Sequence, residues 1–318
     1  MRTEFDFIQN IKNKYGLTRV GDDCAVLPKD GESDMVVTAD LLVEGIDFRL
    51  DWTTPEFLGH KALAVSLSDI AAMGGKPDWA MLSIGVPPGL WGDHFLDMFY
   101  AGWHELAAEH GVELVGGDVS RVPDQLVIDS IVGGSVPHSK AILRSGARPG
   151  DQIYVTGPLG GAAAGLHYLQ RGERLESLKD MKLQPILLRQ LRPNPRSAAA
   201  EYLSANEIPT AMIDISDGLS SDLHHLIDAS GVGARLWVNS IPIEEYAFVD
   251  VTSFDVFERA LHGGEDFELL FTVDPKKISP EKLSDFHRIG EVTITEGIIE
   301  VIGDGKTEIL EAQGYRHF

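Results

Sequence analysis

Aspartates placed at the ends of short apolar runs or beside glycines are the residues of this chain best suited to chemistry. A carboxylate at the end of a strand or helix is held firmly and can still reach a cleft. Carboxylate oxygens are the ligands that hard cations such as Mg²⁺ prefer, and converging carboxylates repel one another unless a cation lies between them. The pattern therefore predicts a magnesium-loaded phosphate site. The aspartates concerned are Asp22, Asp23, Asp40, Asp69, Asp118, Asp214 and Asp217.

The net charge agrees with this interpretation and excludes others. The chain has 27 Lys and Arg against 49 Asp and Glu, which gives a formal charge of −22 at pH 7. It therefore lacks a basic footprint for nucleic acid, and no nucleic-acid partner is expected. An acidic protein needs bridging cations to hold an anionic nucleotide, because bare carboxylates repel phosphate. Most of the acids are expected to be solvated surface groups, so the magnesium hypothesis depends on the aspartates named above.

Length, hydrophobic content and cysteine usage are typical of a globular protein. The 318 residues with 43% hydrophobic content can bury a sizeable core, and a rule of about 100–200 residues per domain suggests two domains. Residues 1–16 interleave charged and apolar side chains, so no signal peptide is expected, and no apolar stretch is long enough to cross a membrane. We therefore expect a cytoplasmic protein with no membrane partner. The single cysteine, Cys24, excludes an internal disulfide and favours a core position.

A helix predicted over residues 55–72 carries one of the aspartates. Thr53 or Thr54 can cap its start, and Pro55 suits an early helical position. Apolar residues recur at helical spacing and mark its buried stripe. Asp69 is then expected in the last turn, just before a pair of glycines ends the helix.

The other elements of the first half alternate between strand and helix signals. A second helix is predicted over residues 91–110, with aromatic residues on its inner face and a glycine as its stop. Strands are predicted at residues 35–38, 111–118 and 126–132. This mixture indicates an α+β first domain that closes near residues 137–140.

The second half begins the pattern of turn, strand and helix again. A strand is predicted over residues 211–216, and it runs into a helix that starts at the corner 216–218 and stops at Gly231. Asp214 at the strand exit and Asp217 at the helix start are then expected to face one opening. The segments at 262–273 and 296–310 are predicted to be strands joined by turns and a hairpin.

Familiar phosphate-binding signatures are missing, so a nucleotide must be held in another way. Residues 305–307 resemble the end of a P-loop, but Glu300 stands where the first glycine is required, and the Asp-Gly pair at 304–305 favours a hairpin turn. No G-x-G-x-x-G spacing occurs, which excludes the dinucleotide fingerprint and the protein-kinase glycine loop. A glycine pair can approach a phosphate, although alone it is more often a plain turn. The pairs concerned are at 116–117, 160–161 and 263–264.

Taken together, the motifs resemble the thiamine-monophosphate kinase family of the aminoimidazole-ribotide-synthetase superfamily, whose members use ATP. The ordered series is highly specific, although GGD or SDGL alone would be weak. The match covers nearly the whole chain, in the segments EFDFIQNI, GDDCAV, TADLLVEGIDF, LGHKALAVSLSDIAAMGG, VGGDVSR, LRSGARPGDQIYVTG, IDISDGLSSDLHH, HGGEDFELLFTV and GYRHF.

The resemblance implies a set of site residues. The implied Mg²⁺ ligands are Asp23, Asp40, Asp69, Asp118, Asp214 and Asp217, with the Thr38 hydroxyl and the Ala39 backbone assisting. The residues implied to meet ATP are Gly117, Asp118, Arg144 and Ser216. The residues implied to meet thiamine monophosphate are Asp47, Glu265 and Tyr315. Family members often carry histidine at the position of Asp47, where a thiazolium cation also tolerates a carboxylate neighbour.

The implied reaction transfers the γ-phosphoryl group of ATP to the phosphate of thiamine monophosphate, which gives thiamine diphosphate and ADP and completes thiamine diphosphate biosynthesis. A phosphate monoester has a second pKa of about 6, so it is already an anionic nucleophile and needs no strong general base. Mg²⁺ supplies the charge neutralisation and the in-line alignment that the transfer requires. We therefore expect no His or Cys base. Asp40, Asp118 and Asp214 are expected to be catalytic.

The metals are expected to divide between the two substrates. Asp40 and Asp118 are predicted to hold metals on the nucleotide, while Asp69 and Asp214 hold metals near the acceptor. The histidines are expected to be surface or packing residues. These are His104, His110, His224, His225 and His262.

Other interpretations remain open for single residues and for the whole chain. An isolated aspartate at such a position is more often a cap, and Asp22 can simply shape its turn. Arg144 can be a surface ion-pair residue, and Tyr315, near the C-terminus, can be frayed. A selenophosphate synthetase is a second candidate, but its N-terminal glycine-rich segment with a reactive cysteine is missing. A catalytically silent metal- or nucleotide-binding module is the third.

The resemblance also implies the architecture. Residues 1–138 are expected to form an α+β domain that binds ATP and Mg²⁺ and whose strands pair with those of a second copy, making a barrel across a homodimer. Residues 139–318 are expected to form a C-terminal α/β domain that covers the cleft. The strands at 35–38 and 126–132 would have edges that need cover, which favours association.

Overall fold

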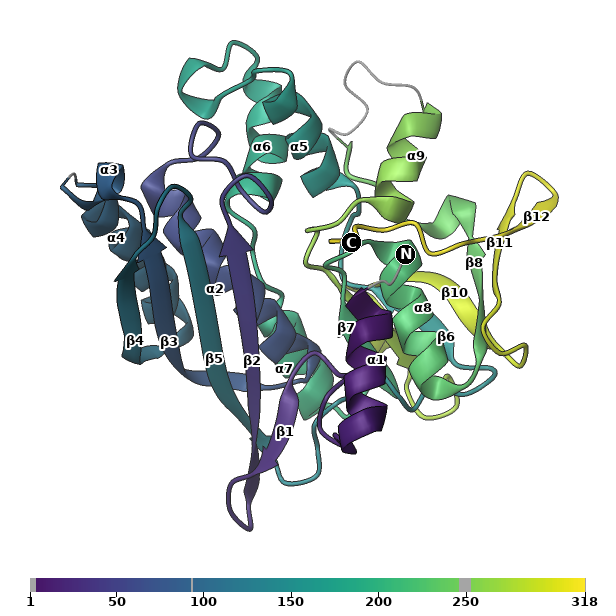
Figure 1. Cartoon of the computed structure of the whole chain (residues 1–318). Helices are drawn as coiled ribbons and strands as arrows, with labels where there is room; N and C mark the ends of the chain where they lie inside the picture. The colour runs from purple at the N-terminus through teal and green to yellow at the C-terminus, as the bar shows by residue number, and fades with distance from the viewer. Residues whose placement is uncertain (1–3, 93, 246–252, 318) are drawn as a thin grey trace.

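Two β-sheets with helices packed on them make up the chain (Figure 1). The computed structural model describes residues 4–92, 94–245 and 253–317. The first sheet comes from the N-terminal half of the chain and the second sheet from the C-terminal half. This mixed α+β composition confirms the fold class expected from the sequence.

The first sheet has the strand order β1-β2-β5-β3-β4. Neighbouring strands are antiparallel except for β3 and β4, which are parallel. Strand β4 follows β3 in the sequence. Because β5 lies between β2 and β3, β4 forms the edge of the sheet that is farther from β2. The strands are β1 (Ala25–Pro28), β2 (Ser33–Val43), β3 (Lys76–Val86), β4 (Glu113–Arg121) and β5 (Val127–Pro137).

Alternation along β2 sends its side chains to the two faces of the sheet. Val36 and Leu42 are buried, and Thr38 and Asp40 share their parity, so these four side chains point to the face that carries the helices. Leu41 lies on the opposite face with 59% of its surface exposed. The site residues of β2 therefore face the helical layer.

Helix α2 (Pro55–Ala72) lies at the centre of the molecule. Thr54 is its N-cap and accepts a hydrogen bond from the Phe57 backbone N–H at 3.3 Å, which confirms one of the two caps proposed from the sequence. The helix contacts β2 and β5 of the first sheet and also β7 of the second. Because it is covered on all sides, it is apolar almost all round instead of having one apolar stripe. Its polar residues are therefore candidates for a site.

The second predicted helix is divided in two. α3 (Pro88–Trp91) ends at its C-cap Gly92, and α4 runs from Phe95 to His110. α4 stops at Gly111, which adopts the left-handed conformation with φ 68°, as a glycine stop requires. The aromatic residues expected on its inner face, Phe95, Phe99 and Trp103, are buried, and so are Leu106 and Ala107. The helix is thus four residues shorter than predicted at its start.

The second sheet has the order β12-β11-β8-β10-β6-β9-β7. Only β11 and β8 are parallel among its described pairs. The strands are β6 (Gln152–Val155), β7 (Ala211–Asp214), β8 (Gly233–Trp237), β9 (Leu269–Val273), β10 (His287–Thr293), β11 (Ile299–Gly303) and β12 (Lys306–Ile309).

Helix α8 (Leu219–Ser230) packs on this sheet against β7, β8 and β9, and α1 (Glu4–Tyr15) lies beside α8 in Figure 1. The other helices of the second half are α5 (Gly161–Gln170), α6 (Gln184–Leu191), α7 (Ser197–Ala205) and α9 (Ser253–His262), and α5 packs against both α6 and α9. Short 3₁₀ helices occupy Leu175–Ser177, Met181–Leu183, Val238–Ser240 and Pro280–Leu283.

A hairpin turn connects β11 and β12. Gly303 pairs with Lys306, and the two residues between them, Asp304 and Gly305, have φ values of 49° and 74°. Positive φ at both central residues is the geometry of a tight hairpin turn. The structure thus confirms that the GKT segment is a hairpin and not a P-loop.

Each sheet has its own hydrophobic core. Trp103 and Phe99 are among the largest fully buried side chains of the first core, and Cys24, 2% exposed, belongs to the same core. The second core lies between the second sheet and α8. None of the helices in the described part of the chain has the length and apolarity that crossing a bilayer requires.

Candidate functional site

Elements from both halves of the chain bring a group of carboxylates together. Asp23 precedes β1, Asp69 lies in the last turn of α2, and Asp214 is the last residue of β7. Oxygen atoms of these three carboxylates lie within 4.8 Å of one another. Asp214 is 1% exposed and Asp23 8% exposed. The sequence pattern therefore identified three acids that do converge.

Hydroxyl groups orient the carboxylates. Ser66 donates to Asp40 Oδ2 at 2.6 Å, and Ser68 donates to Asp214 Oδ2 at 2.6 Å. Residues two positions apart on a helix point in different directions, so these serines of α2 reach β2 on one side and β7 on the other. Thr38 in turn donates to Asp69 Oδ2.

In each case a hydroxyl holds one oxygen of the carboxylate, a contact that is usual around metal-binding acids. Sequence reasoning named Thr38 but missed Ser66 and Ser68. Their spacing before Asp69 was the signal that could have found them.

Arg144 provides positive charge to this group. Its Nη2 lies 2.6 Å from Asp23 Oδ1, and Asp22 Oδ1 accepts its backbone N–H at 2.6 Å. Asp22 therefore fixes the Arg144 segment, and it is not among the three converging carboxylates. The other oxygen of Asp23 is buried and has no hydrogen-bond partner among the described residues. A buried carboxylate oxygen without a partner fits a cation that the chain itself does not supply.

Burial and mutual repulsion make these acids hard to ionise. Burial raises the pKa of Asp214 to about 8, with Asp23 adding to the effect, and burial raises the pKa of Asp40 to about 6. The pKa of Asp69 is well above its ordinary value because of burial and then the charges of Asp40 and Asp214. Such a set is fully ionised near neutral pH only when a cation lies among its members. The donor set, made of oxygen alone, fits Mg²⁺.

Burial also raises the pKa of the Cys24 thiol well above its ordinary value, and the nearby charges of Asp69 and Asp23 add to the effect. A thiol in this state stays protonated at neutral pH. This agrees with the expectation that the cysteine is a core side chain and not a base.

A second group lies at the start of α8, and of its members Asp217 was expected from the sequence while Asp222 and His225 were not. Asp217, Asp222 and His225 place ligand atoms within 4.8 Å of one another. Asp222 accepts the backbone N–H groups of Asp217 at 3.1 Å and Gly218 at 2.9 Å, so it connects the first turn of α8 to the corner before the helix. Burial lowers the pKa of His225 to about 4, which keeps its imidazole neutral at pH 7. The i, i+3 spacing of Asp222 and His225 on α8 was the available signal.

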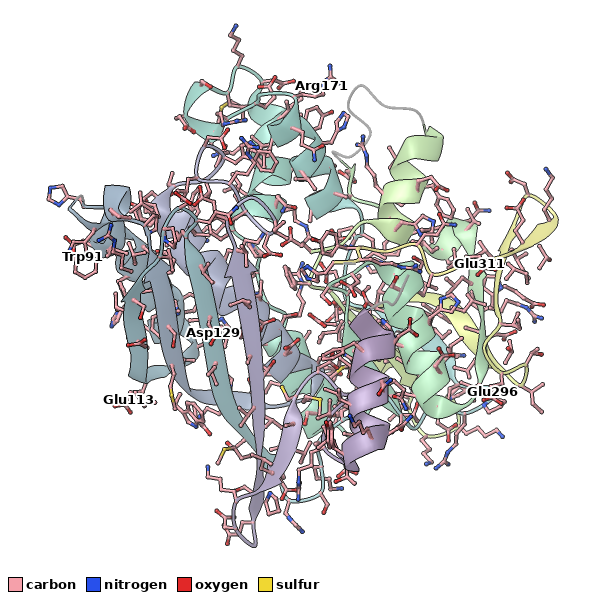
Figure 2. The ribbon with its side chains drawn as sticks, in the orientation of Figure 1. Trp91, Glu113, Asp129, Arg171, Glu296 and Glu311 are labelled. Carbon is pink, nitrogen blue, oxygen red and sulfur yellow. The ribbon has the colours of Figure 1, made fainter. Side chains whose placement is uncertain are left out.

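Asp118 does not join the carboxylates of its own chain. It lies on the exposed strand β4, where it pairs with Ser83 of β3, and Ser83 pairs with Asp129 of β5. Figure 2 shows Asp129 on the first sheet and Glu113 at the start of its β4 edge. β4 lies three strands from β2, a separation of about 14 Å at ordinary strand spacing. In this register Asp118 also points to the face opposite to that of Asp40.

Gly117, next to Asp118, is required by close packing. Its φ is +149°, and a Cβ built there would lie 1.9 Å from the Leu82 carbonyl oxygen. Any side chain would therefore push β4 away from β3.

The residues expected to meet the acceptor lie on three separate segments. Asp47 Oδ2 accepts the Val43 backbone N–H at 2.7 Å, so this carboxylate stabilises its own turn. Glu265 forms an ion pair of 2.6 Å with Lys61 of α2, and Tyr315 is 46% exposed, with its backbone N–H donating to the Asp217 carbonyl at 3.0 Å.

The site segments of the second half are tied to one another through backbone groups. The Glu265 backbone N–H donates to the Ser216 carbonyl at 2.8 Å, which places the residue expected to meet ATP beside one expected to meet the acceptor. The C-terminal segment is attached to the same corner, because the Gly314 N–H donates to Ser221 Oγ at 3.0 Å. The Glu265 segment and the C-terminal segment are therefore both held by residues 216–221.

One of the glycine pairs considered for phosphate binding has an internal partner. The backbone N–H groups of Gly160 and Ala162, at the start of α5, donate to Asp266 at 2.6 and 3.1 Å. A carboxylate of the chain itself thus occupies the position where an anion would bind. The pair at 160–161 is a structural turn.

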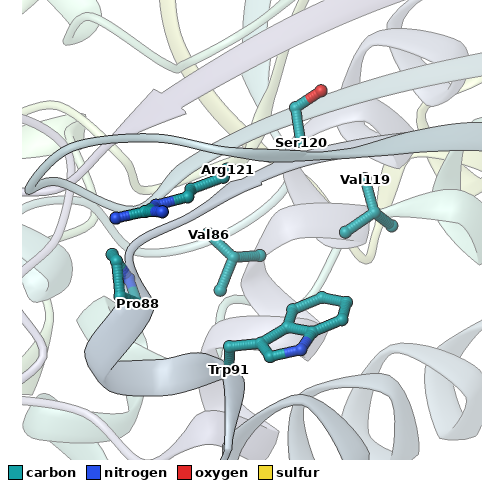
Figure 3. A pocket seen from close by; sticks show the side chains of 6 residues that line it. All are labelled: Val86, Pro88, Trp91, Val119, Ser120 and Arg121. Carbon is teal, nitrogen blue, oxygen red and sulfur yellow. The ribbon is translucent and has the colours of Figure 1, made fainter.

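A cavity of about 420 Å³ lies beside β4, away from the carboxylate group. Figure 3 shows the Trp91 ring facing Val86 and Val119, with Arg121 and Pro88 on the other side. Its lining is mainly apolar, and it belongs to the same edge strand as Asp118.

Comparison with family models identifies both halves of the chain. Residues 21–136 match the N-terminal domain of AIR synthase related proteins, and residues 148–301 match the C-terminal domain of the same proteins.

Curated relatives match over nearly the full length. The thiamine-monophosphate kinase of Salmonella typhimurium strain LT2 is 37% identical over 309 residues, which cover 95% of this chain and 92% of that protein. The thiamine-monophosphate kinase of Bacillus subtilis strain 168 is 34% identical over 306 residues, which cover 94% of this chain and 93% of the relative.

Solved structures give the same result. A structure described as AaThiL complexed with AMPPCP and TMP has a TM-score of 0.88 and 32% identity, covering 99% of this chain and 97% of that chain. The thiamine-monophosphate kinase of Stenotrophomonas maltophilia K279a has a TM-score of 0.79 and 33% identity, covering 95% and 98% of the two chains. The hydrogenase maturation protein HypE in complex with ATP, 17% identical with a TM-score of 0.70, shares the fold.

Proposed function

The chain belongs to the thiamine-monophosphate kinase family of AIR synthase related proteins, and from this membership we propose that it transfers the γ-phosphoryl group of ATP to thiamine monophosphate. The observation that carries the proposal is the full-length similarity, with a TM-score of 0.88, to a structure holding an ATP analogue and TMP. The convergence of Asp23, Asp69 and Asp214 in this chain supplies the matching chemistry. The products are thiamine diphosphate and ADP.

The acceptor brings its own nucleophile, so the chain needs no general base. The phosphate of thiamine monophosphate is anionic near neutral pH because its second pKa is about 6. Cys24 is protonated and lies in the core, and the imidazole of His225 is neutral in a group with two carboxylates. The task of the site is therefore to hold two anions in line and close together.

We propose that Asp23, Asp69 and Asp214 hold Mg²⁺, with Asp40 beside them. When bound, Mg²⁺ neutralises the phosphate charges and polarises the phosphoryl oxygens. Ser66, Ser68 and Thr38 fix the carboxylates before substrate arrives, so the acids need little reorganisation during the reaction. The other proposed Mg²⁺ ligands are the Thr38 hydroxyl, the Ala39 backbone, Asp118 and Asp217.

The nucleotide and the acceptor are proposed to meet different segments. Arg144 and Ser216, together with Gly117 and Asp118, are the proposed contacts of ATP. Asp47, Glu265 and Tyr315 are the proposed contacts of the acceptor. The short backbone distance between Glu265 and Ser216 supports a common cleft for both. The predicted domain boundary between residues 138 and 139 and the predicted cytoplasmic location both stay predictions.

We further propose that Asp118 acts in the site of a second copy of the chain. Residues 38–43 of β2 pair with β5 on one side, and no described strand lies on their other side, because β1 pairs only with residues 34–37. β4 is likewise an edge, with β3 as its described partner. Pairing of β4 from one copy with the free half of β2 from the other would close a barrel and bring the strand that carries Asp118 beside the strand that carries Asp40.

Apolar exposure supports this association. Leu41, Val115 and Val119 are 59%, 52% and 49% exposed, and Leu114 is 40% exposed. Exposed edges and apolar patches of this kind are usually covered by a partner. A homodimer would cover both edges and supply the acid that one chain cannot.

The proposed function is tested with the purified protein, Mg²⁺ and ATP, offered thiamine monophosphate, thiamine or an aminoimidazole ribonucleotide precursor. We expect thiamine diphosphate and an equal amount of ADP with thiamine monophosphate alone. Asp69→Asn should lower the rate about 100-fold or more, while the exposed Asp285→Asn should keep it. Product from the aminoimidazole precursor would indicate a different AIR-synthase-type activity, and no ADP with any acceptor would indicate a silent binding module.

A further inference from the structure

Lys61 has an unusual position for a lysine. It lies in the first half of α2, and its side chain is only 5% exposed. An ammonium group removed from water is costly unless it is paired and hydrogen-bonded. The burial of Lys61 therefore indicates that its positive charge has a specific role at this position.

The partner of Lys61 is Glu265. Nζ lies 2.6 Å from Oε1 of Glu265, and the other carboxylate oxygen accepts a hydrogen bond from Gln190 Nε2. Both oxygens are thus anchored by protein donors, yet the side chain is still 29% exposed. A carboxylate oxygen can accept more than one hydrogen bond, so the exposed side of Glu265 keeps capacity for a further donor.

Lys61 also connects the segments around Glu265. Its Nζ lies 3.5 Å from the carbonyl oxygen of Asp47 and 3.4 Å from that of Gln190. One ammonium group therefore faces the turn after β2, the end of α6 and the loop before β9. Two of these segments carry Asp47 and Glu265, the residues proposed to meet the acceptor.

The backbone of Glu265 has an unfavourable conformation that depends on surrounding contacts. Its φ is 66°, a left-handed conformation that non-glycine residues rarely adopt, and Phe267 two positions on has φ 50°. Such a conformation persists only when surrounding contacts determine it. The Ser216 carbonyl holds the backbone N–H of Glu265, while Lys61 and Gln190 hold the carboxylate.

We propose that Lys61 is a positioning residue for the acceptor: it holds the Glu265 carboxylate in the orientation that receives the organic part of thiamine monophosphate. This inference rests on the proposed function. The acceptor carries an amino group on its pyrimidine ring and a cationic thiazolium ring, and an oriented carboxylate attracts both. The phosphate of thiamine monophosphate then lies near the carboxylates at the C-terminal end of α2.

The first test compares Lys61→Met with the wild-type enzyme. Methionine keeps the apolar length and removes the charge, so the KM for thiamine monophosphate should rise about tenfold or more, while kcat and the KM for ATP change less than about threefold. A purely structural role would lower the amount of active enzyme without this selective change. Lys140→Met is the matched control, because Lys140 forms an exposed pair with Glu207, and it should leave both KM values unchanged.

The second test asks whether Lys61 acts through Glu265. Glu265→Gln should itself raise the KM for thiamine monophosphate, and adding Lys61→Met to it should change that KM by less than about twofold further. The double variant removes both charges, so no unpaired charge is left buried and the fold is retained.

The outcomes separate the two proposals. A wild-type enzyme that makes no thiamine diphosphate contradicts the proposed function. An active wild-type enzyme whose Lys61→Met variant keeps its KM for thiamine monophosphate, or loses kcat and ATP binding equally, contradicts the role of Lys61. The role of Lys61 is also contradicted if Lys61→Met raises the KM for thiamine monophosphate as much in the Glu265→Gln background as in the wild-type enzyme.

Discussion

At the scale of single residues, the site consists of carboxylates whose orientation is set by neighbouring hydroxyls. Asp40, Asp69 and Asp214 each accept a hydrogen bond from a serine or threonine. These acids could be predicted because aspartates at the ends of elements are visible in the sequence. The serines were missed although their spacing before Asp69 is visible, because Ser66 and Ser68 acquire their partners only when α2 lies between β2 and β7.

Asp214 should make the metal-free protein less stable as the pH rises. Its pKa is about 8 in the folded chain and 3.8 in the unfolded chain, so between these values the folded state binds the extra proton. The stabilisation is complete below pH 3.8 and is lost as the pH approaches 8. The free energy of unfolding, measured by urea titration in a chelator from about pH 5 to pH 8, should therefore fall.

Two comparisons check this prediction. Asp214→Asn cannot titrate, so its unfolding free energy should depend less steeply on pH over the same range. Saturating Mg²⁺ should stabilise the wild-type protein more at pH 8 than at pH 6, because the cation competes with the protons. An equal pH slope in wild type and Asp214→Asn would show that Asp214 is ionised throughout.

At the scale of elements, α2 determines the geometry of the site. The sequence predicted its bounds and the position of Asp69 correctly and indicated Thr54 as one of two possible caps, since these depend on local signals. The break before α4 was missed, because Pro88 and Gly92 delimit a separate short helix within an otherwise apolar segment. Local patterns thus identified the element but not the interruption beside it.

Close contact between α2 and α4 depends on glycine. A Cβ at Gly102 would lie 1.9 Å from the Glu56 carbonyl oxygen, whereas a Cβ at Gly92 would meet no atom within 4 Å. Gly102→Ala should therefore lower the free energy of unfolding by about 1–3 kcal/mol through overpacking, and Gly92→Ala should change it by less than about 0.5 kcal/mol. Thermal unfolding of both variants measures the difference. Equal melting temperatures of the two variants would mean that α2 and α4 can move apart with little loss of stability.

At the scale of the whole molecule, the sequence could not locate Asp118. Its motif was visible, but its distance from Asp40 depends on the order of strands in the sheet. Because β5 is inserted between β2 and β3, β4 lies at the far edge. Pairing between strands distant in the sequence is not encoded in local patterns, so the acids predicted to work together lie apart in one chain.

Mixing two inactive variants tests the shared site. Asp40→Asn and Asp118→Asn should each be inactive as homodimers, because every site lacks one acid. A mixed dimer has one site with both substitutions and one site with neither. Co-refolded in equal amounts, the two variants should therefore recover about a quarter of the wild-type rate per chain. No recovery, although size-exclusion chromatography shows mixed dimers, would mean that both acids act within one chain.

The most direct measurement of the account as a whole is the dependence of phosphoryl transfer on divalent cations. The purified protein is freed of metal with a chelator, given ATP and thiamine monophosphate, and assayed for thiamine diphosphate while free Mg²⁺ is raised from zero to millimolar. We expect a rate in chelator below about a hundredth of the maximum and full recovery with Mg²⁺. Undiminished formation of thiamine diphosphate in the chelator would contradict a site in which buried carboxylates work through bound cations.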